Sequence, residues 1–312
     1  MSYADKLFVD MCQDIIDNGI STEGEKVRPI WTDTGESAYT IKKFAVVNRY
    51  DLSKEFPAIT LRRTAVKSAV NEMLWIWQKK SNNISELKSS VWDEWADKSG
   101  TIGKAYGYQI GKIYAHHVYN DGEDLSEYPS ASIKEIDSDT ADGIVSRKYV
   151  FLDRVDGARY DLKNNPFSRR IMVNMYDFED LHDMHLYPCA YSMTFNVTTK
   201  GDKLILNGIL NQRSQDILAA NNWNVCQYSV LLYMLARDVD MEVGELVHVI
   251  ADAHIYDRHI ELVKELITRE QYPAPKFTLN PDKKNFYEFT EDDITLCDYK
   301  HGEQIRNIPI AV

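Results

Sequence analysis

Cys189 and Arg213 are the residues whose types and spacing could do chemistry together in this chain of 312 residues. Alternating apolar residues predict strands over 190–197 and 204–210, and the intervening segment 198–202 is rich in turn residues. If the strands pair as a hairpin, Cys189 enters one strand and Arg213 leaves the other at the same end of the sheet. A nearby guanidinium favours the thiolate, the nucleophilic form of cysteine, and its planar fork can also bind a phosphate. Alone, Cys189 would be interpreted as a small buried side chain and Arg213 as a surface charge.

Glu72 is a second candidate, because it lies on the apolar stripe of a helix predicted over 64–78. Its neighbours one turn away are Ala69 and Ile76. A carboxylate in such a position is either paired structurally or functional. Its position alone leaves both interpretations open.

The pair Pro188-Cys189, the cluster Gln212-Arg213-Ser214-x-Asp216 and the following Asn224 resemble the signature of thymidylate synthases, over most of the chain. The resemblance implies an α+β fold whose mixed sheet packs against helices, with one sheet face forming a homodimer interface. It implies a single domain, 1–312, with a variable inserted subdomain at about 111–148. The implied reaction converts dUMP to dTMP with 5,10-methylenetetrahydrofolate as co-substrate and without a metal.

The resemblance assigns nucleotide-binding roles to residues throughout the chain. Arg28 stands in an Arg-x-x-Trp loop typical of a bacterial subgroup, and Arg169 and Arg170 end an intact Asn-Pro-x-Ser-Arg-Arg motif. These two arginines would cross the dimer interface to the partner's phosphate. The remaining implied dUMP ligands are Gln212, Arg213, Ser214, Asp216, Asn224, His254 and Tyr256.

Catalytic and folate-binding roles also follow from the resemblance. Cys189 would be the nucleophile, Glu72 would order water near the pyrimidine O4, and Tyr106 would assist proton abstraction. The amide of Asn224 complements O4 and N3–H of uracil, whereas cytosine presents the opposite pattern; the bland alternative is a helix N-cap. The implied folate-binding residues are Trp92, Trp95, Leu186, Asp216, Ala220 and Ala311, the last in a tail that would fold over the folate.

Four departures from the family pattern bear on the expected folate site more than on the nucleotide site: Ala190, Ala220, the triplet Asn221-Asn222-Trp223, and Ala251. The changes around Ala220 and Trp223 keep a dUMP hydroxymethylase open as an alternative, which would admit water to the methylene intermediate. A Cys-His hydrolase using Cys189 and His185 would leave Arg169, Arg170 and Asn224 without a task. An RNA-binding module that has lost catalysis would not need Cys189 and Glu72.

The overall charge of −12 argues against a protein that coats nucleic acid or a membrane surface. An acidic protein that binds an anionic substrate must gather its arginines locally. The four cysteines are widely spaced, which suits a reduced, cytoplasmic chain better than a disulfide framework. We see neither a signal peptide nor an apolar run of membrane-spanning length.

Other patterns give expectations about local structure. Periodicity predicts helices over 3–18, 150–163 and 223–240, a further helix beginning at 252, and a strand over 171–176. Trp92 and Trp95 are spaced to share a helical face, with core packing as the ordinary explanation. His116-His117 and the pair His182 and His185 lack further ligands, so solvated segments are expected rather than metal sites. Asp33-Thr34-Gly35 is expected to be a turn, not an aspartic-protease triplet.

Overall fold

The structure is a computed structural model that describes residues 1–141 and 143–312. Its centre is a seven-stranded mixed sheet in the order β1-β2-β10-β8-β7-β6, with β9 pairing β10. The helices are α1 (Tyr3–Asn18), α2 (Val66–Trp77), α3 (Gly107–Ile110), α4 (Arg154–Asn164), α5 (Asn221–Asp238) and α6 (Ile260–Leu266). The strands are β1 (Ile20–Ser21), β2 (Thr40–Asp51), β3 (Tyr114–Val118), β4 (Ser132–Thr140), β5 (Gly143–Leu152), β6 (Met172–Asn174), β7 (Ala190–Lys200), β8 (Lys203–Gln212), β9 (Gln215–Asp216), β10 (Glu242–Tyr256), β11 (Lys276–Leu279) and β12 (Ile294–Cys297). This arrangement confirms the predicted α+β fold.

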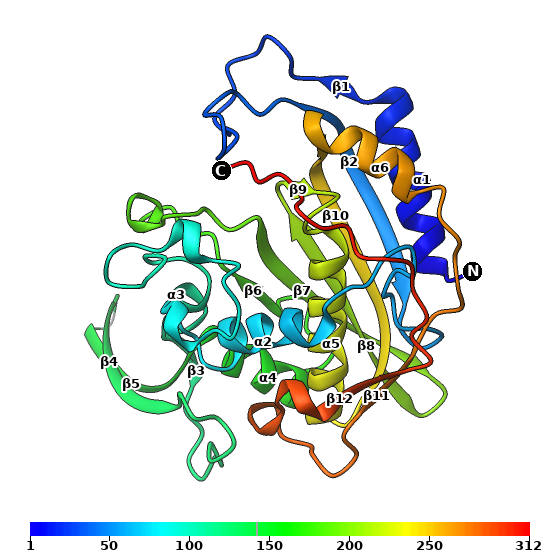
Figure 1. Cartoon of the computed structure of the whole chain (residues 1–312). Helices are drawn as coiled ribbons and strands as arrows, with labels where there is room; N and C mark the ends of the chain where they lie inside the picture. The colour runs from blue at the N-terminus through cyan, green and yellow to red at the C-terminus, as the bar shows by residue number, and fades with distance from the viewer. Residues whose placement is uncertain (142) are drawn as a thin grey trace.

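Helices α2 and α5 pack together over the inner face of the sheet, and α1 packs beside β2 (Figure 1). The apolar stripe of α1 buries Phe8, Met11 and Ile15, as its periodicity predicted. Ser2 caps this helix by accepting the backbone N–H of Asp5 at 3.0 Å. Helix α5 is buried along most of its length, so it forms the centre of the core.

The predicted hairpin is confirmed, because β7 and β8 pair antiparallel from Ala190↔Gln212 to Lys200↔Lys203. Gly201 in the tight turn has φ 61°, a conformation that glycine adopts without strain. β8 then runs parallel to β10, so the carboxyl ends of these two strands lie at the same edge of the sheet. That edge brings residues 213–216 close to residues 252–256.

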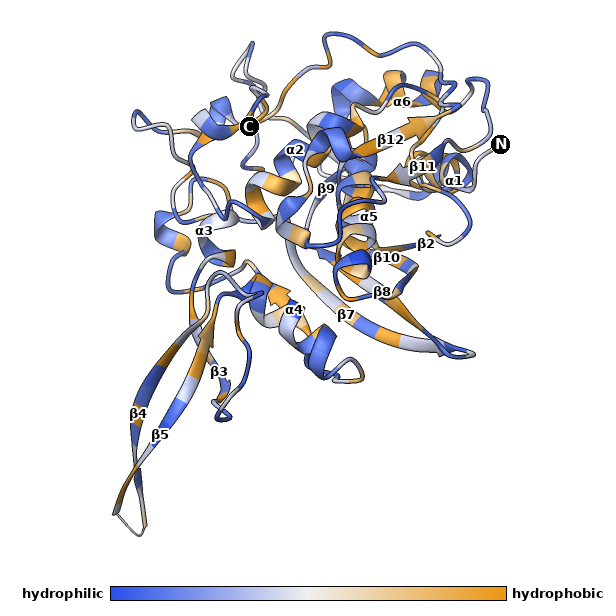
Figure 2. Cartoon of the chain, turned by 90° about the horizontal axis from the view of Figure 1, so that it is seen from below, coloured by the Kyte–Doolittle hydropathy of each residue, from blue (hydrophilic) through white to orange (hydrophobic). Residues whose placement is uncertain are grey.

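The segment predicted as an insertion contains strands β3, β4 and β5, which form a separate antiparallel sheet in the order β3-β5-β4. β4 and β5 extend away from the rest of the chain (Figure 2). Both strands are mostly exposed, and this exposure explains why the sequence shows only weak apolar alternation there. The division of the chain into a domain and a subdomain stays a prediction.

Two predicted helix starts are wrong. Val150 lies in β5, and α4 begins only at Arg154, where the Asp153 carboxylate accepts the N–H groups of Val155 and Asp156. Residues 252–256 continue β10 rather than opening a helix, because their backbones pair with β2, from Asp252↔Phe44 to Tyr256↔Thr40. The following α-helix, α6, begins at Ile260.

Candidate active site

Cys189 and Arg213 lie together, as the hairpin predicted. The Arg213 Nη2 atom is 3.6 Å from the Cys189 sulfur, and the backbone N–H of Arg213 donates to the Cys189 carbonyl at 3.0 Å. The same guanidinium donates to the carbonyls of Pro188 at 3.0 Å and Tyr187 at 2.7 Å. A shift of pairing register between Ala190 and Ser192 loosens the ladder beside the cysteine. Arg213 therefore both fixes the turn that carries the thiol and faces its sulfur.

Burial raises the pKa of the Cys189 thiol above its ordinary value, although the Arg213 and Arg28 guanidiniums oppose the rise. The neighbouring guanidiniums favour the thiolate, as predicted, but the loss of hydration on burial has the larger effect on the pKa of Cys189. Arg28 is exposed on its loop, yet it lies near enough to act on both Cys189 and Tyr256.

Tyr106 lies directly behind the nucleophile. Its hydroxyl accepts the backbone N–H of Cys189 at 3.0 Å, and its ring packs edge-on to Trp92 with centroids 5.0 Å apart. Tyr106 has φ 44°, a strained conformation for a non-glycine residue. Burial, followed by the nearby Cys189, raises the pKa of this phenol well above its ordinary value. The hydroxyl therefore keeps its proton and can donate a hydrogen bond to water or substrate.

Glu72 lies in α2, as predicted, and is only 5 % exposed. Burial raises its pKa to about 7, against the opposing effects of Gln227, Trp223 and Trp92. One carboxylate oxygen, Oε1, accepts from Gln227 at 2.9 Å, while Oε2 has no hydrogen-bond partner among the described residues. A carboxyl group with a pKa near neutrality and a free oxygen is suited to transferring protons.

Asn224 is not the N-cap of α5, because that position belongs to Ala220. Its Oδ1 lies 3.3 Å from the Nε2 atoms of Gln212 and Gln215, and its Nδ2 donates to Gln227 at 2.9 Å. The Asn224 side chain is thus held in place by three neighbouring amides.

Asp216, His254 and Tyr256 gather where β9 pairs with the end of β10. His254 bonds through Nδ1 to Asp252 at 2.8 Å, and the rings of His254 and Tyr256 are 5.1 Å apart. Burial would raise the pKa of Asp216, but His259, His254 and the N–H of Ala219 together hold it below its ordinary value. Asp216 is therefore a partly buried anion. Ser214 lies in the bend between β8 and β9.

Trp92 and Trp95 do not share an α-helical face, because residues 93–95 form a single 3-10 turn. Their rings nevertheless pack edge-on with centroids 5.8 Å apart, and Trp92 is buried beside Tyr106. Leu186 is partly buried and packs against the core. The Trp95 carbonyl lies 3.0 Å from His185 Nδ1, so His185 supports the aromatic wall and makes no contact with the Cys189 sulfur among the described residues.

The C-terminal tail is tied to the Arg28 loop. Ile30 and Val312 exchange two backbone hydrogen bonds, at 2.9 and 3.0 Å, and Ala311 forms a bridge with Trp31. His259 bonds to the Pro309 carbonyl at 2.9 Å, and its other ring nitrogen is 3.8 Å from Asp216. Ala220 is the remaining folate candidate, and its backbone N–H donates to the Asp216 carbonyl at 3.1 Å. The tail, the Arg28 loop and Asp216 thus adjoin.

Arg169 and Arg170 are exposed just before β6, and neither guanidinium forms an ion pair or hydrogen bond within residues 1–141 and 143–312. Arg213 and Arg28, and not these two arginines, are the cations that act on the Cys189 thiol within the described chain. The predicted strand there is also shorter, covering only Met172–Asn174.

His116 and His117 are not solvated as expected. Their Nδ1 atoms lie 2.8 Å apart, His117 Nε2 is 2.8 Å from Glu123, and His117 stacks on Tyr160 with centroids 4.4 Å apart. Among the described residues, no group of three or more His, Cys, Asp or Glu side chains is arranged to hold a metal ion. Asp33-Thr34-Gly35 forms the predicted turn, and its Asp33 pairs with Arg258.

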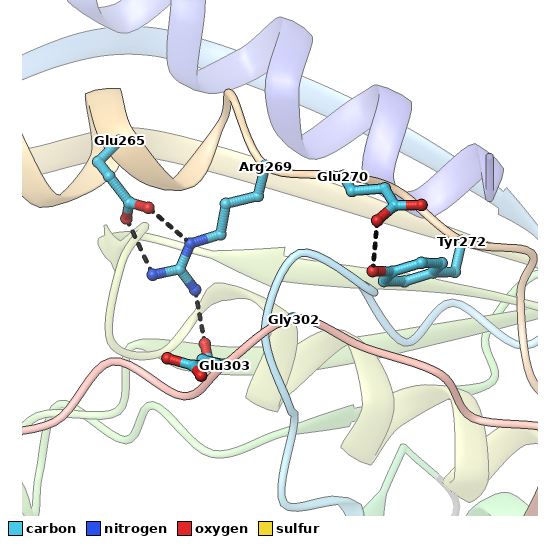
Figure 3. A pocket seen from close by; sticks show the side chains of 6 residues that line it. All are labelled: Glu265, Arg269, Glu270, Tyr272, Gly302 and Glu303. Carbon is cyan, nitrogen blue, oxygen red and sulfur yellow. Dashed lines mark hydrogen bonds and ion pairs between the residues drawn. The ribbon is translucent and has the colours of Figure 1, made fainter.

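A separate pocket involves none of the predicted site residues (Figure 3). Arg269 is its one cation, and its guanidinium is already bound to Glu265 at 2.9 Å and to the backbone carbonyl of Glu303. Its lining comprises Glu265, Arg269, Glu270, Tyr272, Gly302 and Glu303. These contacts tie the C-terminal segment to α6 and leave no nucleophile there.

Four buried polar residues support the site without having been predicted to do so: Gln215, Asn222, Gln227 and His248. Of these, only Asn222 stood out in the sequence, as part of a departure from the family pattern. Asn222 accepts from the Ile59 N–H at 3.0 Å and from the Thr64 hydroxyl at 2.6 Å, and it donates to the Pro57 carbonyl at 2.8 Å. It thereby anchors the segment before α2 to α5, which accounts for one of the departures noted above. The sequence signal that could have identified two of them is the presence of amide side chains, Asn222 and Gln227, at core-facing positions of α5.

No helix in the described part of the chain has the length and apolar character needed to span a membrane.

Comparisons with known proteins agree with this geometry. The family model described as thymidylate synthase matches residues 6–312. A thymidylate synthase of Bacillus licheniformis is 39 % identical over 308 residues, covering 98 % of each chain, and that of Bacillus phage phi3T is 38 % identical over the same length and coverage. The solved structure of thermostable thymidylate synthase A from Bacillus subtilis matches with a TM-score of 0.82 and 37 % identity, covering 100 % of both chains. By its sequence over nearly its whole length and by its fold, the chain belongs to the thymidylate synthase family, and thus to the methyltransferases.

Proposed function

We propose that this chain converts dUMP to dTMP with 5,10-methylenetetrahydrofolate, through a covalent bond between the Cys189 sulfur and C6 of the pyrimidine. The observation that carries the proposal is the Arg213 guanidinium 3.6 Å from that sulfur, beside an Asn224 amide held by three neighbours. The first feature suits addition of a thiolate next to a bound phosphate, and the second suits recognition of a uracil edge.

The reaction begins when the Cys189 thiol loses its proton and its sulfur lone pair forms the bond to C6. The electrons of the C5–C6 double bond then move toward C5 and O4. Asn224 and water held by the free Oε2 of Glu72 would stabilise the charge at O4. Because Glu72 has a pKa near 7, it can return a proton to O4 and remove it again.

Tyr106 would assist in removing the C5 proton, acting through water, since its hydroxyl stands against the Cys189 backbone. The folate supplies the one-carbon unit and the hydride that completes the methyl group. The C5–C6 double bond then re-forms as the bond between C6 and the Cys189 sulfur breaks, which releases dTMP and restores the thiolate. Trp92 and Trp95 offer an aromatic wall for its pterin, and the partly buried anion Asp216 offers acceptors for pterin N–H groups. The tail at Ala311 would cover the folate from the side of the Arg28 loop.

The active enzyme would be a homodimer in which Arg169 and Arg170 enter the partner's site. Both side chains are exposed and unpaired within the described residues, as this role requires. The outer sheet face also carries exposed apolar side chains, including Val47, Met172 and Ile209. A mixture of Cys189→Ser chains with Arg169→Ala/Arg170→Ala chains should regain activity that neither has alone, because some heterodimers contain one complete site.

The direct experiment incubates the protein with dUMP and 5,10-methylenetetrahydrofolate, follows dihydrofolate absorbance and identifies the pyrimidine product by mass spectrometry. We expect dTMP and dihydrofolate in equal amounts. Hydroxymethyl-dUMP without dihydrofolate would instead identify a hydroxymethylase, an alternative that none of the named relatives supports. Absence of both products would overturn the proposal.

A substitution tests the base assignment. Asn224→Asp should shift binding from dUMP toward dCMP, since a protonatable carboxyl group can offer cytosine the donor and acceptor pattern that the amide denies it. An unchanged dUMP preference would remove the role assigned to Asn224.

A further inference from the structure

A continuous chain of side-chain hydrogen bonds crosses the site from β10 to α2. It starts at His248, whose Nε2 is 2.7 Å from Gln212 Oε1, and continues from Gln212 Nε2 to Asn224 Oδ1 at 3.3 Å. Asn224 Nδ2 then donates to Gln227 Oε1, and Gln227 Nε2 donates to Glu72 Oε1, both at 2.9 Å. The order is therefore His248, Gln212, Asn224, Gln227, Glu72.

The Glu72 end fixes the direction of this chain. Gln227 Nε2 lies 3.0 Å from the backbone carbonyl of Ala69 as well as 2.9 Å from the carboxylate. A carbonyl oxygen can only accept, so the atom facing it must be the amide nitrogen. Gln227 consequently presents its oxygen to Asn224, and the Asn224 atom facing it must be the donor Nδ2.

The contacts of Asn224 Oδ1 independently indicate the same orientation of the Asn224 amide. Gln215 Nε2 lies 3.3 Å from the Asp216 carbonyl, which can only accept, and 3.3 Å from Asn224 Oδ1. Gln212 also presents its nitrogen to Oδ1, provided that its own oxygen accepts a proton from His248. Two NH₂ groups therefore face one side of Asn224 and an oxygen faces the other.

His248 meets this requirement when its Nε2 carries a proton. The residue is 0 % exposed, and burial lowers its pKa to about 3, so it stays neutral at physiological pH. Its Nδ1 has no hydrogen-bond partner among the described residues, whereas Nε2 faces the Gln212 oxygen. The single proton of the neutral ring is therefore expected on Nε2. Gln212, Gln215 and Gln227 are also buried, so water does not readily replace their bonds.

We propose that His248 and Gln227 are positioning residues that fix the sense of the Asn224 amide and thereby set the preference for uracil over cytosine. Rotating an amide by half a turn exchanges its donor and acceptor, which is the exchange that cytosine would need. A rotated Asn224 would place its NH₂ against two NH₂ groups and its oxygen against an oxygen. The inference rests on the proposed function, because it assumes that Asn224 faces the base.

The two positioning residues differ in what else they touch. Gln227 also binds Glu72, so its substitution disturbs the proton-transferring carboxyl group as well as Asn224. Among the described residues, the His248 side chain forms one hydrogen bond, and its partner is Gln212. His248 therefore gives the cleaner test of amide sense.

The experiment compares binding of dUMP and dCMP by titration calorimetry for the wild type, His248→Leu and His248→Gln. Loss of the donor in His248→Leu should narrow the dUMP-to-dCMP affinity ratio by roughly five- to tenfold, the usual effect of one unsatisfied buried polar group. His248→Gln, whose amide can donate to Gln212, should recover part of the ratio. His182→Leu removes an exposed histidine, 72 % exposed in its side chain, and should change nothing.

A second measurement uses the unaltered protein, so that it does not depend on whether a variant folds. Nitrogen NMR of ¹⁵N-histidine-labelled wild type should show the buried His248 ring as the neutral Nε2–H tautomer. An Nδ1–H tautomer would overturn the inference, and so would an unchanged affinity ratio in a folded His248→Leu variant. Failure of the wild type to bind dUMP would instead refute the proposed function, so the two failures are distinguishable.

Discussion

The two halves of the site are built differently. The half assigned to the nucleotide consists of Cys189, Arg213 and Asn224, held by paired strands, by α5 and by a directed set of hydrogen bonds. The half assigned to folate consists of a single 3-10 turn with Trp92 and Trp95, the short strand β9 with Asp216, and the C-terminal tail. Regular secondary structure thus fixes the first half, while segments distant in sequence meet to form the second.

We expect this difference to separate recognition of the nucleotide base from closure of the site over the folate. In the nucleotide half, buried amides bond to one another and allow one arrangement of donors and acceptors. In the folate half, closure depends on two backbone bonds between Ile30 and Val312 and on His259, which lies between Pro309 and Asp216. Changes in the first half should therefore affect chemistry and base choice, and changes in the second should affect use of the folate.

The largest expected effect comes from Cys189→Ser. A serine hydroxyl is a far weaker nucleophile at neutral pH than cysteine, so turnover should be lost while the dUMP dissociation constant changes only a few-fold, about 1 kcal/mol or less. Steady-state assays and calorimetry check both values. Cys297→Ser, at an exposed cysteine, is the matched control and should keep full activity. Retained turnover in Cys189→Ser would contradict the covalent mechanism.

Glu72→Gln should change the pH dependence of stability. Burial raises the pKa of Glu72 from 4.5 to about 7, so within that window the folded chain holds a proton that the unfolded chain has lost. The unfolding free energy must therefore fall as pH rises from about 4.5 to 7, by roughly 3 kcal/mol in total. Glutamine cannot ionise, so this component of the pH dependence should disappear.

Denaturant unfolding at about pH 5 and about pH 8, at one protein concentration, measures the contribution of Glu72 to the pH dependence of the unfolding free energy. Glu179→Gln, at an exposed glutamate, is the control and should keep the wild-type pH dependence. If Glu72→Gln and wild type lose the same stability between the two pH values, the carboxyl group is not the one that binds the proton.

Removal of Ala311 and Val312 tests the folate half alone. The deletion abolishes the bonds of Val312 to Ile30 and the bridge of Ala311 to Trp31. Loss of two hydrogen bonds should raise the folate KM roughly tenfold and leave dUMP binding within about twofold. Equal weakening of both ligands would show that the tail supports the whole site and would end the separation of the two halves.

The sequence predicted the parts of the molecule in which periodicity or a motif is explicit. The hairpin around 198–202, the helix bearing Glu72 and the meeting of Cys189 with Arg213 all follow from patterns that local physics imposes. The helix expected at 252 failed because the pairing of β10 with β2 and β9 is a long-range property.

The supporting polar residues could not be predicted for a related reason. Gln227 and His248 occupy ordinary core-facing positions, and their partners Glu72 and Gln212 are 155 and 36 residues away in sequence. Likewise, the rise in the pKa of Cys189 depends on burial, which the nearby arginine does not reveal. The roles assigned to individual site residues stay predictions until the substitutions above are measured.

The smallest expected effect concerns Arg258, which ties down the Arg28 loop. It pairs with Asp33 at 2.9 Å and Glu36 at 3.1 Å and lies over the Trp31 ring at 4.7 Å. Both carboxylates are well exposed, so these contacts contribute only about 1 kcal/mol together with the ring. Arg258→Gln should therefore raise the dUMP KM roughly two- to fivefold at low salt with kcat unchanged, and less at high salt.

Lys67→Gln breaks a comparably exposed pair with Asp292 and should leave both constants unchanged. A fall in kcat for Arg258→Gln would mean that the loop takes part in the chemical step, and the boundary between the two halves would then have to include it.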